Sequence, residues 1–131
     1  MKQAVLVTML FVTLFISGLS SCGDRKNEPG TAAITYYNYL IAGDYQQYVK
    51  GMLSCDSLPA EYRVRIETTI KQYLAREKQE NGGLKTVELL NDSLSNDGAS
   101  ANVFLDVSFG NGMKEAICLP LVLDKGVWRM L

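Results

Sequence analysis

Histidine is absent from all 131 residues of the chain. This absence excludes Ser-His-Asp and Cys-His catalysis, imidazole metal ligation and an imidazole pH switch within the sequence. A basic excess is also missing, because 13 Lys and Arg side chains accompany 14 Asp and Glu side chains, and this balance argues against nucleic acid as a partner. The sequence also lacks Cys-x-x-Cys pairs, glycine-rich phosphate loops and calcium-loop carboxylate spacings, so it predicts no metal and no cofactor.

The first recognisable feature is an export signal over residues 1–21. Lys2 is followed by an apolar run that ends at Ile16, and small residues then precede Cys22. A cation, a short apolar core and small residues are typical of a secretory signal peptide. The alternative is a permanent transmembrane helix, but the apolar run is shorter than the roughly 20 residues that a membrane span needs.

The end of this segment, Leu19-Ser20-Ser21-Cys22, resembles the lipobox of bacterial lipoproteins. The resemblance implies that lipid is attached to the thiol of Cys22 and that cleavage makes Cys22 the first residue of the mature protein. Such acyl chains anchor a protein to a membrane, because each buried methylene contributes about 0.8 kcal/mol. We therefore expect a protein of the bacterial cell envelope that faces the periplasm or the exterior. The alternative is a cysteine that merely follows an ordinary signal peptide.

Two segments follow the signal peptide. Residues 22–30 have no large apolar side chain and mix both charges, so they are predicted to form a solvated tether. Residues 31–131 are then the folded unit, which is large enough for one core without a metal or several disulfides. Outside the reducing cytoplasm, Cys55 and Cys118 could form a disulfide, or they could be two small buried residues.

The first half of the folded unit has the periodicity of helices. Over residues 31–42 the apolar side chains recur every three to four positions, with Thr31 as the expected N-cap and Gly43 as the stop. Asp44 is placed to cap a short second helix. A third helix is expected over residues 57–81, starting at a Ser57 cap. Its apolar stripe consists of Leu58, Tyr62, Ile66, Thr69, Ile70 and Tyr73.

Charged residues flank that stripe. Glu61 lies four residues before Arg65, and Glu67 lies four residues before Lys71, which is the spacing of ion pairs along a helix. We interpret these charges as a solvated helix face rather than a binding patch.

The second half of the folded unit has the two-residue period of strands. The expected strands span residues 84–90, 101–109, 113–123 and 127–131, and the pattern leaves the facing of the first of them ambiguous. The second of them alternates between apolar and polar side chains, as a strand with one buried face does. Pro120 cannot donate a ladder hydrogen bond, which predicts an edge or a bulge at that position. Helices followed by an antiparallel sheet indicate an α+β fold.

Two local features carry a resemblance to a known class. They are Ala42-Gly43-Asp44-Tyr45 between helices and the closing Leu123-Asp124-Lys125-Gly126-Val127-Trp128-Arg129 hairpin. Both look like small bacterial lipoproteins that carry a domain of unknown function of the nuclear transport factor 2-like (NTF2-like), or cystatin-like, class. The resemblance covers about residues 30–131. It implies N-terminal helices packed on a curved antiparallel sheet of about four strands, often with a pocket between them, and it implies no particular activity.

Four residues are candidates for a pocket or a contact surface. Tyr37 lies on an apolar stripe, which suits core packing or a pocket wall. Tyr39 projects away from that stripe and suits a contact residue or an ordinary exposed one. Asp106 lies on the polar face of a strand, which suits either the wet side of a sheet or a catalytic carboxylate. Trp128 suits closure of the core or a pocket wall.

Three hypotheses of function follow. The one we favour is a non-catalytic, lipid-anchored domain that binds a small ligand or another envelope protein, because the sequence has a lipobox and no catalytic constellation. The second is an isomerase-like or hydrolase-like enzyme with a Tyr/Asp pocket, since ketosteroid isomerase shares the fold class and uses those residue types. The third is a structural component of the envelope that has neither a pocket nor an apolar patch.

Overall fold

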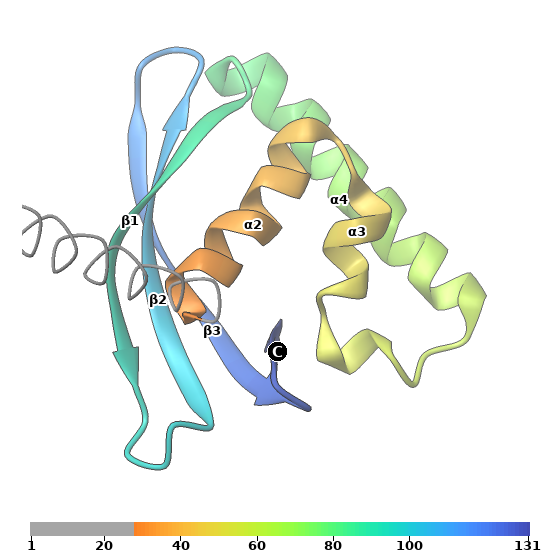
Figure 1. Cartoon of the computed structure of the whole chain (residues 1–131). Helices are drawn as coiled ribbons and strands as arrows, with labels where there is room; N and C mark the ends of the chain where they lie inside the picture. Colours follow the sequence, from red (N-terminus) through yellow and green to blue (C-terminus); the bar gives the residue numbers. More distant parts are fainter. Residues whose placement is uncertain (1–27) are drawn as a thin grey trace, which may run out of the picture.

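A computed structural model describes residues 28–131, in which a layer of helices packs on one face of a four-stranded antiparallel sheet (Figure 1). The predicted signal peptide, Cys22 and the rest of the chain up to residue 27 lie outside the described residues. The α+β class and the four-stranded antiparallel sheet are confirmed, with the strands in sequence order across the sheet. The elements are α2 (Pro29–Ala42), α3 (Tyr45–Lys50), η2 (Leu53–Cys55), α4 (Ala60–Asn81), β1 (Leu84–Leu94), β2 (Ser100–Phe109), β3 (Lys114–Asp124) and β4 (Val127–Met130). Over residues 28–131, no helix combines the length and the apolar run that crossing a bilayer requires.

Helix α2 begins two residues earlier than the sequence predicts. Pro29 occupies the first helical position, where its missing N–H costs no hydrogen bond, and Glu28 is the N-cap. Pro29 and Gly30 are both buried, so they belong to the folded unit and not to the tether. A Cβ atom on Gly30 would lie 2.9 Å from a methyl carbon of Leu89, so glycine lets the start of α2 approach β1 closely.

The predicted signals at the junction of α2 and α3 are confirmed. Gly43 ends α2 in the left-handed conformation, with φ of 77°. The Asp44 carboxylate accepts a hydrogen bond from the backbone N–H of Gln47 at 3.3 Å, which caps α3. Helix α4, by contrast, starts without the predicted Ser57 cap. Instead, the Arg63 guanidinium donates to the carbonyl of Leu58 at 3.1 Å.

The core lies between α2 and the inner face of β2. The alternation predicted for this strand is confirmed, and its inward side chains are buried: Ala101, Val103, Leu105, Val107 and Phe109. Ala33 of α2 is fully buried against them, and its small side chain allows the helix to lie close to the sheet. Leu121, Trp128 and Met130 extend the same core across β3 and β4.

The first strand is longer than predicted. Strand β1 continues to Leu94, through a polar stretch that has no alternating pattern, and its pairing with β2 shifts register between Leu89 and Asn91. This irregularity moves the side chains of the second half of β1 out of phase with those of the first half. The exposure of the side chains along β1 follows no two-residue period in either half of the strand.

Pro120 lies where β3 is still an edge strand, as the sequence predicts. Strand β4 pairs with β3 only from Leu121 to Asp124, so the preceding part of β3 is paired with β2 alone. The missing N–H of Pro120 is tolerated at such a place because no strand lies beyond it.

Helix α4 contributes no buried residue to the core. None of its 22 residues is buried, and it packs mainly along α3 and near β1 rather than on α2. The predicted stripe is therefore only partly buried: Ile66 and Ile70 are half-buried, whereas Tyr62 and Tyr73 are exposed. The carboxyl end of α4 is fixed by the β2–β3 turn, where Asn111 N–H donates to the carbonyl of Asn81 at 2.9 Å.

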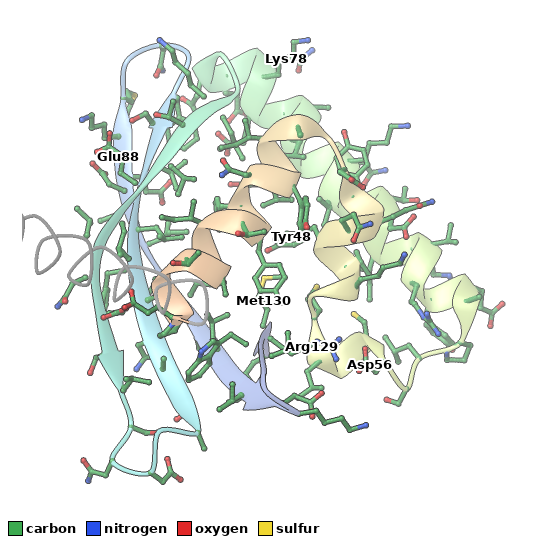
Figure 2. The ribbon with its side chains drawn as sticks, in the orientation of Figure 1. Tyr48, Asp56, Lys78, Glu88, Arg129 and Met130 are labelled. Atoms are coloured by element: carbon green, nitrogen blue, oxygen red, sulfur yellow. The ribbon has the colours of Figure 1, made fainter. Side chains whose placement is uncertain are left out.

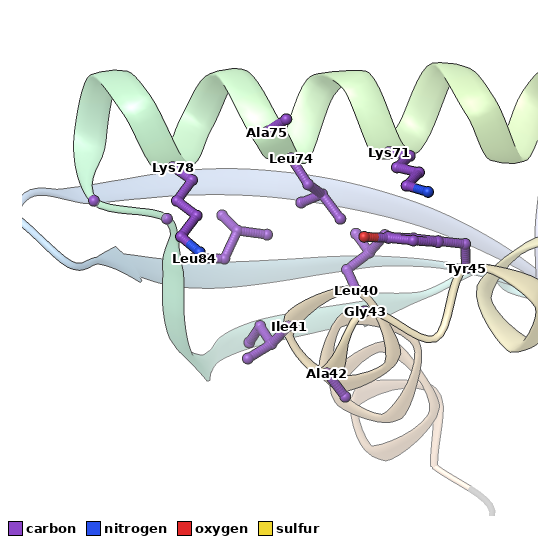
Figure 3. A pocket seen from close by; sticks show the side chains of 12 residues that line it. Leu40, Ile41, Ala42, Gly43, Tyr45, Lys71, Leu74, Ala75, Lys78 and Leu84 are labelled. Carbon is purple, nitrogen blue, oxygen red and sulfur yellow. The ribbon is translucent and has the colours of Figure 1, made fainter.

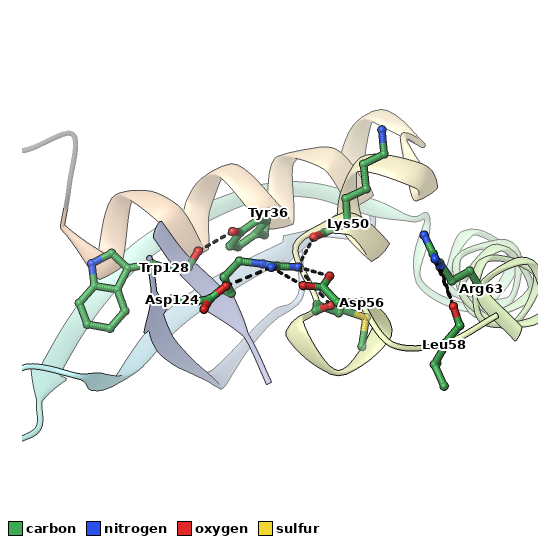
Figure 4. Close-up of polar contacts among 9 residues, drawn as sticks. Tyr36, Lys50, Asp56, Leu58, Arg63, Asp124 and Trp128 are labelled. Carbon is green, nitrogen blue, oxygen red and sulfur yellow. Dashed lines mark hydrogen bonds and ion pairs between the residues drawn. The ribbon is translucent and has the colours of Figure 1, made fainter. Parts of the chain in front are cut away.

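A junction between β4 and the end of α3 holds the helices to the sheet (Figure 4). The backbone N–H of Met130 donates to the carbonyl of Gly51 at 2.8 Å, and the Tyr36 hydroxyl donates to the carbonyl of Trp128. A Cβ atom on Gly51 would lie 2.3 Å from the ring of Tyr36. Glycine at residue 51 therefore allows the ring, the helix end and β4 to meet.

Arg129 adds hydrogen bonds and ion pairs to the same junction. Its guanidinium donates to both carboxylate oxygens of Asp56, at 2.6 and 2.7 Å, and to the carbonyl of Lys50 at 2.8 Å. Asp124 lies 3.5 Å away on the other side. The hydrogen bond from Arg129 lowers the pKa of Asp56 below its usual value, and the charges of Arg129 and Arg63 act in the same direction.

We predict that Gly51→Ala destabilises the protein by about 1–3 kcal/mol, because the added methyl group must displace the Tyr36 ring. The φ of Gly51 is −73°, so the substitution introduces no left-handed strain and isolates the steric effect. Chemical denaturation of the single variants and of Gly51→Ala with Tyr36→Leu measures the coupling. A cost for Gly51→Ala that stays the same in the Tyr36→Leu background would contradict the contact.

We further predict that Asp56→Asn lowers the melting temperature at pH 7. The lowered pKa means that the carboxylate stabilises the fold above its unfolded value of about 3.9, and that this contribution is lost as pH falls through the folded pKa. Melting curves of the variant and the wild type should therefore converge below about pH 4. Asp106→Asn, on the face of the sheet away from the helices, is the matched control. Its melting temperature should equal that of the wild type both at pH 7 and below about pH 4.

Candidate functional site

The four residues singled out from the sequence do not converge on one site. Asp106 is half-buried on the outer face of β2, beside Glu88 of β1, and faces away from the helices. Trp128 is buried in the core cluster, which agrees with closure of the core. Tyr37 packs against that cluster from α2, and Tyr39 is half-buried on the same helix. Asp106 and the tyrosines therefore do not form the Tyr/Asp pocket that the second hypothesis requires.

A different carboxylate approaches the tyrosines. Tyr37, Tyr48 and Tyr73 come from α2, α3 and α4, and Glu115 comes from β3. Burial raises the pKa of Tyr37, and the neighbouring Tyr48, Tyr73 and Glu115 raise it further. Burial also raises the pKa of Tyr48 and of Tyr73. Tyr48 packs against the core cluster that includes Met130, and both residues are labelled in Figure 2. At neutral pH these hydroxyls are protonated, and none of the three tyrosines lines a hollow described below.

The two cysteines of the described residues are free thiols, so the possible disulfide between them is not formed. Cys55 is buried in η2 within the helical layer. Cys118 is exposed and is paired in register with Phe104 on the outer face of the sheet. Because the sheet separates that face from the helical layer, the alternative interpretation, a small buried residue, applies to Cys55 only.

A groove of about 460 Å³ lies between α2 and α4 (Figure 3). It exists because α4 packs on α3 and near β1, and does not close against α2. Its apolar lining includes Leu40 and Ile41 from the end of α2, Leu74 from α4 and Leu84 from the start of β1. It is larger than the two other hollows described below.

Two lysines give the groove its charge. Lys71 and Lys78 of α4 both line it, and its lining includes no carboxylate. The ion pair predicted between Glu67 and Lys71 is not formed, and neither lysine takes part in an ion pair within the described residues. Glu67 instead lines a smaller hollow of about 160 Å³ between α3 and α4. Glu61, Arg65 and Lys71 are exposed, as expected of a solvated helix face, and the charges of this helix are divided between two sides.

The groove and the start of α2 lie at opposite ends of β1. Gly30 packs on Leu89 and Asp92 in the second half of the strand, whereas the groove includes its first residue, Leu84. The 14 residues of α2 span about 21 Å at 1.5 Å per residue. The chain therefore enters the domain about one helix length away from the groove.

The remaining hollows offer less to a ligand. The small one beside Cys55 is lined by charged side chains of both signs, among them Asp56, which is already paired with Arg129. A third hollow, of about 250 Å³, lies at the β1–β2 end of the sheet and includes Leu94 and Leu131. Within the part of the chain that the structure describes, no cluster of three or more acidic or cysteine side chains could hold a metal ion.

The layer of helices on one face of a four-stranded antiparallel sheet is an α+β arrangement of the NTF2-like fold, as a comparison with solved structures shows. A solved protein of Campylobacter jejuni, provisionally named an NTF2-like transpeptidase, has a similar structure, with a TM-score of 0.58. The two chains are 19% identical, and the similarity covers 76% of this chain and 93% of that protein. At this identity the similarity establishes the fold alone. Comparisons with family models and with curated proteins find no match.

Proposed function

We propose that this protein is a lipid-anchored component of the bacterial cell envelope whose NTF2-like domain binds a small ligand without catalysis. The proposed anchor rests on the Leu19-Ser20-Ser21-Cys22 sequence. Cys22 lies six residues before Glu28, a stretch that spans at most about 20 Å. Lipid on Cys22 would therefore keep the domain close to the membrane surface.

The observation that carries the binding function is the groove between α2 and α4. Its volume of about 460 Å³ falls within the range of roughly 300–1,000 Å³ that is usual for small-molecule sites. Its apolar side chains and two lysines also fit the common pattern of an apolar surface with a few polar groups. A ligand there would occupy the end of the domain away from the start of α2.

Catalysis has less support. An acyl-transfer reaction of the kind suggested by the name of the Campylobacter protein needs an activated nucleophile, usually Ser or Cys beside a base. Cys55 is buried, and the hollow beside it is lined by Asp56, Arg63 and Glu67, with no imidazole in the sequence to act as base. Asp106 faces away from the tyrosines. We therefore favour binding over an enzyme with a Tyr/Asp pocket.

The anchor predicts a specific modification. When the full chain is produced in a bacterium with an alkyne-tagged fatty acid, the wild type should carry the label, because acylation follows a lipobox cysteine. Cys22→Ser should lose the label and its membrane association, whereas the control Cys118→Ser should keep both. Label retained in Cys22→Ser would contradict the proposed anchor.

The groove predicts ligand binding that a bulky side chain can block. A fragment screen by saturation-transfer NMR, using the acylated protein in vesicles and protein-free vesicles as the blank, should find binders. Ala75→Trp should abolish their signals, because Ala75 lines the groove. Ala116→Trp, on the outer face of β3, is the matched control and should leave the signals unchanged. Binders that persist in Ala75→Trp would place the ligand elsewhere and contradict the proposed site.

A further inference from the structure

We propose that the groove between α2 and α4 takes a ligand with two anionic groups separated by an apolar spacer, with Lys71 and Lys78 each holding one anionic group. The inference rests on the proposed function, because it names the ligand class for the same groove. It goes further by assigning a charge, a spacing and two residues to the recognition.

The spacing of the lysines comes from the helix. Lys71 and Lys78 are seven residues apart, which places them on the same face of α4 after almost two turns. At 1.5 Å per residue, their Cα atoms are about 10.5 Å apart along the axis. Figure 3 shows the two side chains directed from α4 toward the groove, near its two ends. At this spacing, the two ammonium groups cannot both contact one compact anionic group unless the two lysine side chains bend toward each other.

Between the lysines, α4 presents apolar side chains to the groove, and Tyr45 adds a hydroxyl from the side of α3 (Figure 3). Leu74 and Ala75 occupy the turn of α4 between them, and Leu40 and Leu84 line the opposite side of the groove. Burial of apolar area contributes roughly 25 cal/mol per Å², so a hydrocarbon spacer suits this surface better than a polar one. The lining thus alternates in the order cation, apolar centre, cation along α4.

The lysines are available to a ligand. The hydrogen bonds and ion pairs of the described residues include neither amino group, and the groove has no carboxylate that could neutralise them. The one acidic residue at helical spacing before Lys71, Glu67, lines the hollow on the α3 side. Two unneutralised cations beside apolar walls produce a positive potential that attracts anions and repels cations.

The test compares three ligands of equal length: octanedioate, octanoate and octanediol, with two, one and no negative charges. The acylated full-length protein is reconstituted in vesicles of zwitterionic lipid, and dissociation constants are measured by saturation-transfer NMR against protein-free vesicles. We expect octanedioate to bind most tightly, octanoate less tightly and octanediol most weakly. Each lost charge contact should weaken binding by about threefold to fivefold, as is typical of partly exposed ion pairs.

Single variants separate the two lysines. Lys71→Gln and Lys78→Gln should each weaken the binding of octanedioate by about threefold to fivefold, so that it binds no more tightly than octanoate binds to the wild type. Neither variant should change the affinity for octanediol. Lys114→Gln and Lys125→Gln change the net charge equally but lie outside the groove, on β3 and the β3–β4 turn, and should leave all three affinities unchanged.

Two results would overturn the inference. One is octanedioate binding no more tightly than octanoate to the wild type, and the other is equal weakening by the control lysine variants. If the three ligands bind equally and Ala75→Trp abolishes their binding, the groove remains a ligand site and only the two-anion assignment fails. If none of the three binds and the fragment screen finds no binder, the inference and the proposed function fail together.

Discussion

The contact between the Tyr36 ring and the backbone of Gly51 is the constraint on which the arrangement of the two layers depends. Because Gly51 has no side chain, the end of α3 can lie against α2 while the carbonyl of Gly51 accepts a hydrogen bond from Met130 of β4. Arg129, the neighbour of Met130, then joins β4 to Asp56. Strand β4 has only four residues, so these interactions, and not its length, fix it to the helices.

The position of α4 follows from this junction. The helix packs along α3, which the junction holds, and its carboxyl end is fixed by hydrogen bonds to the β2–β3 turn. Between those supports it has no buried side chain, and a groove separates it from α2. The candidate ligand site is thus a direct result of how little of α4 the core covers.

Most of the fold could be predicted from local patterns, and most of the candidate site could not. The alternation along β2, the glycine at the end of α2 and the Asp44 cap depend on neighbours in sequence, and all three are confirmed. The register shift after Leu89 and the steric role of Gly51 depend on partners far away in the chain, which no periodicity records. The sequence predicts an ion pair between Lys71 and Glu67, which the structure does not form. The seven-residue spacing of Lys71 from Lys78 was visible in the sequence, but its meaning depends on the gap between α2 and α4.

The shortness of β4 affects how the sheets of two neighbouring copies of the domain can pair. It leaves the first part of β3 as an open edge, which in many proteins is a template for pairing with a strand of another copy. Here that edge carries Lys114, Glu115 and Pro120, and the opposite edge, β1, is made irregular by its register shifts. Charges, proline and bulges all oppose the addition of a further strand. The sheet is thus protected at both edges against self-association into larger sheets, even where many copies of the domain lie close together.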